Sequence, residues 1–195
     1  VKAILPVVYK AGIVKNGDQI HGVLFKGIDR NFFPGGVPAD SVSLPVSVPQ
    51  RLAELTSLEV GDRMLVYFVG EKVKMRQFNI AAVHDVVVEA DDNLIVYADM
   101  ADMQRLLGWD KDEASAIEII MDSSHKGEAD LKEANMQIGT LVNIYSYDSE
   151  SPVIATSSVS RYPQIYDWLN LIDFNVFFIL VLMTVVAGFN MISGL

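Results

Sequence analysis

The C-terminal run constrains this chain more than any other feature, because the 22 residues from Phe174 to Leu195 include no Asp, Glu, Lys, Arg or His. As a helix, this run would be about 33 Å long at about 1.5 Å per residue. That length is enough to cross a hydrocarbon layer of about 30 Å. A soluble core helix of this length keeps a polar face. The run therefore predicts a transmembrane helix, and a buried helix of a soluble protein is the alternative.

A narrow polar stripe follows this predicted helix. At about 100° per residue, Asn175, Asn190 and Ser193 fall within about 60° of one another. Amide and hydroxyl groups within a span favour a protein neighbour over lipid. We therefore expect this stripe to face the interior of a helix bundle.

The residues before the run have the pattern of an amphipathic helix. Pro163 suits the first turn, where its missing N–H is not needed. One helical face then collects apolar side chains at the spacing i, i+3, i+4, i+7, namely Ile165, Trp168, Leu169 and Ile172. We expect this helix to continue into the span and to dock on the preceding domain through Ile165 and Trp168. The alternative is that these side chains belong only to a core and to an aromatic belt at the membrane surface.

Charge and composition exclude some classes of function. The 195 residues carry a formal charge of −10 at pH 7, so no basic surface is available to displace counterions from nucleic-acid phosphates. Cysteine is absent, which removes disulfides and thiolate metal sites. After Arg161, the flank of the apolar run holds two Asp but no Lys or Arg, and this favours the non-cytoplasmic side of a membrane. The start at Val1, without Met or a leader, indicates a fragment of a longer protein.

The part before the stalk alternates between strand-like and helix-like segments. Strand patterns cover 19–29, 63–70, 75–88, 93–99, 116–121 and 140–147. Within 116–121, Ile117 and Ile119 alternate with Glu118, as on a strand that is buried on one face. The segments 63–70 and 75–88 flank a short turn like the arms of a hairpin.

Three helices are expected among these strands. The first begins at Ser47, which forms a capping box with Gln50. The second is capped by Asp99 and stops at Gly108, and the third covers about 128–139. Antiparallel hairpins mixed with helices predict an α+β domain with an antiparallel sheet and packed helices.

No motif of a catalytic or metal site stands out. The chain has no P-loop and no GxSxG or SxxK serine motif. Its histidines, His21, His84 and His125, are isolated in sequence, and the acidic segment 89–92 has the composition of a solvated loop rather than a cation site. We therefore predict no catalytic residue, no cofactor and no metal ligand.

The junction between the soluble part and the apolar run resembles that of the lipoprotein-releasing ABC transporter permeases, in the version found in Bacteroidota. The resemblance rests on a Tyr-Pro at 162–163, YDWL at 166–169 and FNMIS at 189–193. Upstream, GVLFKGID at 22–29, LEVGDRMLVYFV at 58–69 and NLIVYADMADMQRLLGW at 93–109 resemble segments that recur across the FtsX-like permease superfamily. The resemblance as a whole extends over most of the chain.

The resemblance implies a permease with four transmembrane helices and a large MacB-like periplasmic domain between the first two. Residues 1–160 would then be that domain without its N-terminal part, 161–173 an amphipathic stalk helix, and 174–195 the start of the second transmembrane helix. The stalk would couple the membrane to the domain. The protein would lie in the cell inner membrane, in contact with its lipid, with the soluble part in the periplasm.

The resemblance also implies a function and its partners. A permease of this family is not an enzyme; it works with a separate cytoplasmic ATPase and a second permease subunit, in a homo- or heterodimer. ATP binding closes the membrane helices, and the movement lifts a lipoprotein out of the inner membrane and passes it to a soluble periplasmic carrier. The carrier-binding loop best matches a position within 141–160. An efflux permease of the same superfamily and a membrane-tethered regulator of cell-wall hydrolases are the alternatives.

Overall fold

The computed structural model describes residues 1–36, 43–70, 73–85, 94–122, 127–145 and 153–194. They belong to two compact units, Val1–Ile120 and Met121–Leu195, which we call the barrel unit and the helical unit. The division falls inside the predicted domain 1–160. The boundaries of that domain, of the stalk at 161–173 and of the span at 174–195 stay predictions.

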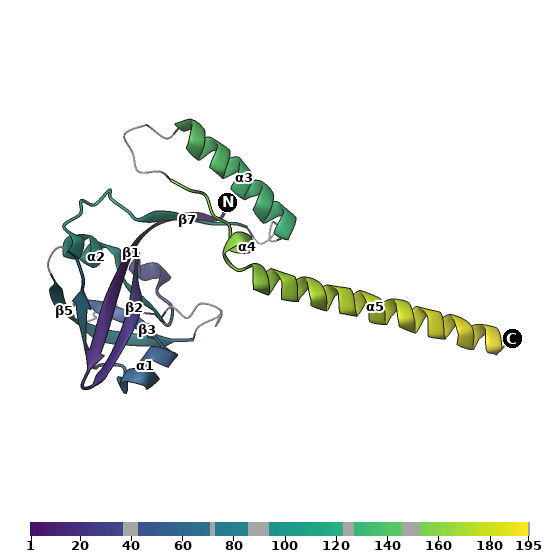
Figure 1. The fold of residues 1–195 in the computed structure, drawn as a ribbon, viewed down its shortest axis with the longest axis horizontal. Helices are drawn as coiled ribbons and strands as arrows, with labels where there is room; N and C mark the ends of the chain where they lie inside the picture. Colours follow the sequence, from purple (N-terminus) through teal and green to yellow (C-terminus); the bar gives the residue numbers. More distant parts are fainter. Residues whose placement is uncertain (37–42, 71–72, 86–93, 123–126, 146–152, 195) are drawn as a thin grey trace. The chain divides into compact units, whose positions relative to one another are not determined.

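The barrel unit contains seven strands and two α-helices among its described residues (Figure 1). The strands are β1 (Ala3–Asn16), β2 (Gln19–Ile28), β3 (Pro45–Pro49), β4 (Arg63–Phe68), β5 (Lys74–His84), β6 (Leu94–Asp99) and β7 (Ala116–Ile120). The helices are α1 (Gln50–Thr56) and α2 (Met100–Leu107), with a short 3-10 helix η1 (Arg30–Phe32) after β2. The strands predicted around β2, β4, β5, β6 and β7 are confirmed in their described parts, whereas β1 and β3 were not predicted.

Six of these strands close into a ring. The neighbours follow in the order β2–β6–β3–β5–β4–β1, and β1 also pairs with β2, so each of the six has a partner on both sides. The pairs β2–β6 and β3–β5 are parallel, and the other pairs are antiparallel. The fold is therefore α+β, as predicted, with a mixed sheet in place of a purely antiparallel one.

The ring consists of two halves with the same topology. In one half, β3 leads into α1 and then into the hairpin β4–β5, with β3 parallel to β5. In the other half, β6 leads into α2, and the hairpin β1–β2 completes the arrangement, with β6 parallel to β2. The halves meet where β3 pairs with β6 and β1 with β4. The junctions β3–α1 and β6–α2 thus occupy equivalent positions.

Apolar side chains fill the interior of the ring. The Phe25 ring lies 5.1 Å, centroid to centroid, from the rings of both Phe68 and Phe78, within the range in which aromatic pairs attract each other. A glycine permits this packing, because a Cβ atom at Gly12 would lie only 3.0 Å from the Val66 side chain. The residues of this core that are wholly inaccessible to water are Val8, Val14, Phe25, Val46, Val66, Val96 and Met103.

The start of α1 differs from the prediction. The capping box of Ser47 and Gln50 is not formed: the residue before α1 is Pro49, and no side chain caps the helix. Ser47 lies within β3, fully buried, and its hydroxyl donates to the Pro34 carbonyl at 2.8 Å. Pairing of β3 with both β5 and β6 holds this serine in an extended strand, so the local helix signal is overridden.

The described part of the helical unit contains α3 (Glu128–Tyr145), α4 (Ser158–Arg161) and α5 (Pro163–Ser193). Helix α3 begins where predicted but does not end near Gly139, so the strand predicted at 140–147 is wrong over its described residues. A Cβ atom at Gly139 would have no neighbouring atom closer than 3.7 Å. The hydroxyl of Thr140 donates a hydrogen bond to the Met136 carbonyl at 2.9 Å. Both residues therefore fit a helix interior.

Candidate functional site

Helix α5 contains every residue of the predicted coupling stalk and of the predicted polar stripe. It runs for 31 residues, from Pro163 to Ser193, without a break between the two segments. In the part of the chain that the structure describes, it is the one helix long and apolar enough to cross a membrane, and none of its apolar window is buried. The predicted continuation of the amphipathic helix into the apolar run is confirmed.

A short junction fixes the start of α5. Ser157 caps α4 by accepting a hydrogen bond from the N–H of Ser160 at 3.3 Å. Pro163 takes the first turn of α5, so Tyr162 alone separates the two helices. The N–H of Ile165 donates to the Tyr162 carbonyl at 3.2 Å. The two helices are therefore joined without a flexible linker.

Polar side chains attach α5 to the other helices of its unit. The hydroxyls of Tyr166 and Ser158 lie 2.9 Å apart, and the Asn170 amide donates to the Glu128 carboxylate at 3.1 Å. Lys132 donates to the same carboxylate at 2.5 Å. These bonds, the one from Lys132 first, lower the pKa of Glu128. Because Tyr166 and Asn170 are four residues apart, they share one side of the helix, and this side faces α3 and α4.

The predicted stalk residues lie on another side of α5. At about 100° per residue, the apolar face of the stalk is centred roughly 130° from Tyr166 and Asn170. Trp168 is 61% exposed and Leu169 45% exposed, while Ile165 is half-buried. The residues of the polar stripe are all exposed: Asn175, Asn190 and Ser193. Docking of Ile165 and Trp168 on the domain, and a bundle-facing stripe, stay predictions.

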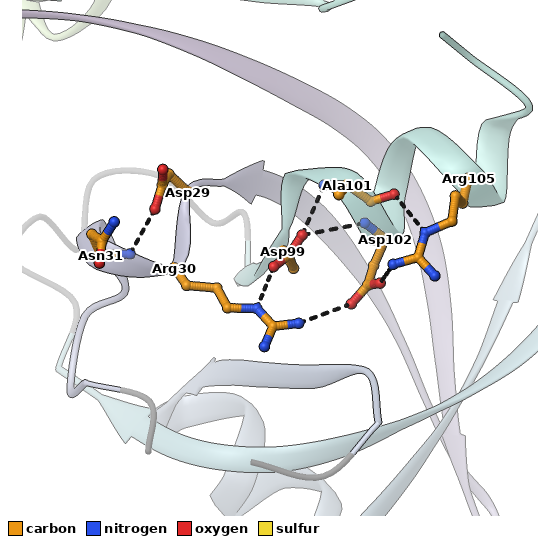
Figure 2. A network of polar contacts seen from close by, with 7 residues as sticks. All are labelled: Asp29, Arg30, Asn31, Asp99, Ala101, Asp102 and Arg105. Carbon is orange, nitrogen blue, oxygen red and sulfur yellow. Dashed lines mark hydrogen bonds and ion pairs between the residues drawn. The ribbon is translucent and has the colours of Figure 1, made fainter. Parts of the chain in front are cut away.

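In the barrel unit, charged side chains gather around the start of α2, as Figure 2 shows. Asp99, the last residue of β6, caps α2 by accepting from the N–H groups of Ala101 at 2.8 Å and Asp102 at 3.4 Å. Arg30 of η1 donates to the Asp99 carboxylate and lies 3.9 Å from that of Asp102. The predicted cap at Asp99 is confirmed, and so is the stop at Gly108, which has a φ of 77°.

Asp102 is the buried member of this network. It is 7% exposed, and Arg105, one turn later, donates to its carboxylate. Burial raises the pKa of Asp102 and the nearby Asp99 adds to the rise, while Arg105 and Arg30 oppose it. Two carboxylates thus face two guanidinium groups. The network connects the loop after β2 to the start of α2, and sequence reasoning found only its cap.

An open pocket of about 840 Å³ borders the network. Its apolar wall includes Ile4, Ile28 and Phe32. Its charged side chains are two acidic and two basic residues, Asp29, Asp99, Arg30 and Lys111. Balanced charges of this kind favour neither an anion nor a cation. Arg30 and Asp99 are paired with each other, and Asp29 accepts from the N–H of Asn31.

A serine–histidine pair in the barrel has the spacing, but not the chemistry, of a nucleophile and its base. Ser47 Oγ lies 2.9 Å from His84 Nδ1. The single hydroxyl proton of Ser47 goes to the Pro34 carbonyl, so Nδ1 must donate to Ser47 rather than accept from it. Burial lowers the pKa of His84, against a smaller rise from Asp85. The pair is a partly buried hydrogen-bond chain that fixes β3 against β5.

The other residues considered for metal binding do not come together. His125 and the segment 89–92 lie outside the described residues. His21 lies in β2, and its buried Nε2 has no hydrogen-bond partner. Across the described ranges, no three His, Asp or Glu side chains form a metal-binding group. Of the predicted carrier-binding position, 141–145 belongs to α3 and 158–160 to α4, and 146–152 lies outside the described residues.

Strand β7 is attached to the ring by contacts that sequence reasoning missed. Glu118 accepts from the Tyr9 hydroxyl at 2.6 Å and from Lys26 at 2.8 Å, while Ile117 is 66% exposed. The burial alternation predicted for β7 is not observed: Ile117 is exposed, Glu118 and Ile119 are both half-buried, and the acidic side chain contacts the ring. The Lys26 ammonium also lies 5.7 Å from the centre of the Tyr97 ring. A register pairing Leu5 with Glu118 places the carboxylate there, and nothing local in the sequence reveals that register.

No protein-family model matches the chain, and no curated protein sequence matches it. Among solved structures, the chain is similar to the extracellular domain of the noncanonic ABC-type transporter YknZ from Gram-positive bacteria. The two share 12% sequence identity with a TM-score of 0.43, over 74% of this chain and 75% of that chain. Because this TM-score is low, the proposals below depend on the residues of the chain itself.

Proposed function

We propose that this chain is the extracytoplasmic domain, with the start of a transmembrane helix, of an ABC transporter permease. The observation that carries the proposal is the uninterrupted helix α5, in which an amphipathic stalk continues into a charge-free run. A continuous helix transmits a displacement along its axis, whereas a flexible linker absorbs it. The resemblance of the junction to that of the lipoprotein-releasing permeases supports the same conclusion.

The length of α5 suits this role. Its 22 charge-free residues, at about 1.5 Å per residue, cross the hydrocarbon layer of about 30 Å. The 11 residues before them add about 16 Å of helix, more than the headgroup layer of one leaflet. The contact of Tyr166 with α4 would therefore lie just outside the membrane, and that of Asn170 with α3 at the level of the headgroups.

In this function, the energy comes from a separate cytoplasmic ATPase, and the permease itself is not an enzyme. Closure of the membrane helices would displace α5. Tyr166 and Asn170 would pass this displacement to α4 and α3, and the stalk residues Ile165, Trp168, Leu169 and Ile172 would pass it to the domain. The polar stripe of Asn175, Asn190 and Ser193 would face a second permease subunit. The cargo would be a lipoprotein of the inner membrane, which a periplasmic carrier receives.

A flexible insertion tests the lever. We would insert Gly-Gly-Ser-Gly between Asp173 and Phe174 in the complete protein, with four alanines at the same place as a control of equal length. Because alanine continues a helix and glycine interrupts it, we expect only the flexible insertion to abolish ATP-dependent lipoprotein release from vesicles. Equal release from both variants would contradict the lever. If the unaltered protein, with its ATPase, releases no lipoprotein, the cargo is wrong, and drug or peptide efflux and activation of wall hydrolases are the next assays.

A further inference from the structure

A smaller pocket of the barrel unit opens beside α2, and neither the membrane helix nor the network around Asp99 accounts for it. Its volume is about 170 Å³. It is bounded by β5, α2 and the residue that precedes β3, and its lining residues are Leu44, Arg76, Phe78, Asp102, Arg105 and Leu106. Two positive charges and one negative charge give this lining a net charge of +1, in a chain whose formal charge is −10.

Arg76 occupies a position of β5 where the strand pattern favours an apolar side chain. Arg76 and Phe78 are two residues apart, so they project from the same face of the strand, and Phe78 is 2% exposed in the barrel core. Lys74 shares this face, and its ammonium donates to the Leu106 carbonyl at the end of α2 at 2.7 Å. β5 therefore places the Arg76 side chain on its core-facing side, next to α2.

The two guanidinium groups of the pocket differ in their partners. Arg105 donates to the Asp102 carboxylate, as Figure 2 shows. Arg76 donates to the carbonyl of the adjacent Met75 at 3.0 Å, and no carboxylate among the described residues forms an ion pair with it. Because Asp102 balances one guanidinium only, the two cations repel each other across a small pocket. An anion bound between them would remove this repulsion.

The apolar part of the lining is held in place by the barrel. Phe78 and Leu106 are 2% and 7% exposed and belong to the core. Leu44 has a φ of 57°, a left-handed conformation that is unfavourable for a bulky side chain. Two bonds from Asn79 hold it there: the N–H donates to the Leu44 carbonyl at 3.0 Å, and the side-chain amide donates to the Ser43 carbonyl. The pocket is thus preformed, with an apolar floor and a positively charged opening.

We propose that this pocket binds a carboxylate that is carried on a short apolar chain. Arg76 and Arg105 hold the carboxylate, because a planar carboxylate matches the paired N–H groups of a guanidinium, and the apolar floor contacts the chain. A phosphate monoester, with a charge near −2, is disfavoured by the net charge of +1 and by Asp102. The carboxylate belongs either to a free acid or to a glutamate side chain of a peptide. The inference does not depend on the proposed function, because the whole pocket lies in the barrel unit.

Titration of the full chain with butyrate in detergent micelles tests the site. The methyl NMR signals of Leu44 and Leu106 report binding, and butanamide, which has a similar shape without the charge, is the matched control. We expect saturable shifts with butyrate, and binding about tenfold weaker or more for butanamide and for inorganic phosphate. Arg76→Gln should weaken butyrate binding about tenfold or more. Arg63→Gln, which changes an arginine of the neighbouring strand β4 outside the pocket, should leave it within about twofold.

Two peptides separate the possible sources of the carboxylate, namely acetyl-Leu-Glu-Leu-amide and the same peptide with Gln in place of Glu. Tighter binding of the glutamate peptide than of butyrate would assign the pocket to a peptide, and binding of butyrate alone would assign it to a small acid. Absence of saturable shifts with both carboxylates, equal binding of butanamide, tighter binding of phosphate, or unchanged binding by Arg76→Gln would each overturn the inference. The comparison of ligands needs no variant, so it decides even if Arg76→Gln fails to fold.

Discussion

The barrel unit and the helical unit differ in where their apolar side chains go. In the barrel unit, aromatic and aliphatic side chains from six strands and both helices are buried against one another. Among the described residues of the helical unit, Val159 is the one buried apolar side chain, and neither α3 nor α5 contains a buried residue. The barrel is thus stabilised by its own core, whereas the apolar side chains of α5 are not covered by the described residues of its own unit. The predictions below test whether the two units are independent in this sense.

The largest expected effect is on function and comes from the helical unit. Replacing Ile165 and Trp168 together by serine removes two apolar side chains from the stalk face. Under the proposed function, we expect the separate ATPase to hydrolyse ATP with this variant without release of lipoprotein, while the urea unfolding of the barrel changes by less than about 0.5 kcal/mol. Asp167→Ser, on the other side of the same turns, is the matched control and should keep release. Normal release by the double variant would remove the coupling role of the stalk.

Within the barrel, Phe25→Ala should have the largest effect on stability. Phe25 is fully buried between Phe68 and Phe78, and removing such a ring costs about 3–5 kcal/mol. The measurement is urea unfolding followed by near-UV circular dichroism. Phe32→Ala, at a ring that is 49% exposed, is the control and should cost far less. If Phe25→Ala also released α5 from membranes, the two units would not be independent.

The two strand–helix junctions of the barrel, β3–α1 and β6–α2, differ in how the start of the helix is capped. At β6–α2, the free N–H groups of the helix are capped by the Asp99 carboxylate, whereas at β3–α1 no side chain caps the helix. We therefore expect Asp99→Ala to cost about 1–2 kcal/mol. Asp99→Asn keeps a capping oxygen but loses its charge toward Arg30, so it should cost less than Asp99→Ala. Equal costs for the two variants would assign the effect to the ion pair instead of the cap.

Sequence reasoning succeeded where local signals decide the structure. The cap at Asp99, the glycine stop at Gly108 and the charge-free run of α5 are each encoded within a few residues of where they act. Sequence reasoning failed where pairing with strands distant in the sequence determines the local structure. The prolines at both ends of β3 argue against a strand, yet β3 is buried between β5 and β6, and this pairing also removes the predicted capping box of Ser47 and Gln50.

In the candidate site, too, some features could be predicted from local sequence and others could not. The spacing of the stalk residues along α5 was readable from the sequence because a helix maps spacing onto faces. The contacts made by Tyr166 and Asn170 could not be predicted in this way. Glu128 is 42 positions before Asn170, and no sequence motif marks Ser158 as the partner of Tyr166. The Lys26–Glu118 pair and the Arg30–Asp102 contact likewise join residues 92 and 72 positions apart. Such contacts depend on ring closure, which no single segment specifies.

The β3–α1 junction should show a pH dependence that comes from His84. Burial lowers the pKa of His84 in the folded state, so the unfolded chain binds the proton more readily. Its contribution to stability is complete above the ordinary histidine pKa of about 6.5 and is lost as the pH falls below that value. His84→Gln can still donate an N–H to Ser47 but does not titrate, so it should flatten the decline in unfolding free energy between pH 7 and 5. An unchanged decline would assign it to other groups.

The β6–α2 junction should show the smallest effect, and one of opposite sign. Burial and Asp99 raise the pKa of Asp102 above its ordinary value of 3.8, so the folded state holds the proton more tightly than the unfolded chain does. This contribution to stability is present at low pH and is lost as the pH rises through the raised pKa. In urea unfolding between pH 3 and 7, the unfolding free energy of Asp102→Asn should therefore rise relative to that of the unaltered protein as the pH increases. If the unfolding free energy of the unaltered protein rose relative to that of the variant instead, the ion pairs with Arg30 and Arg105 would outweigh the effect of burial. The network would then stabilise the fold at neutral pH in addition to holding η1 against α2.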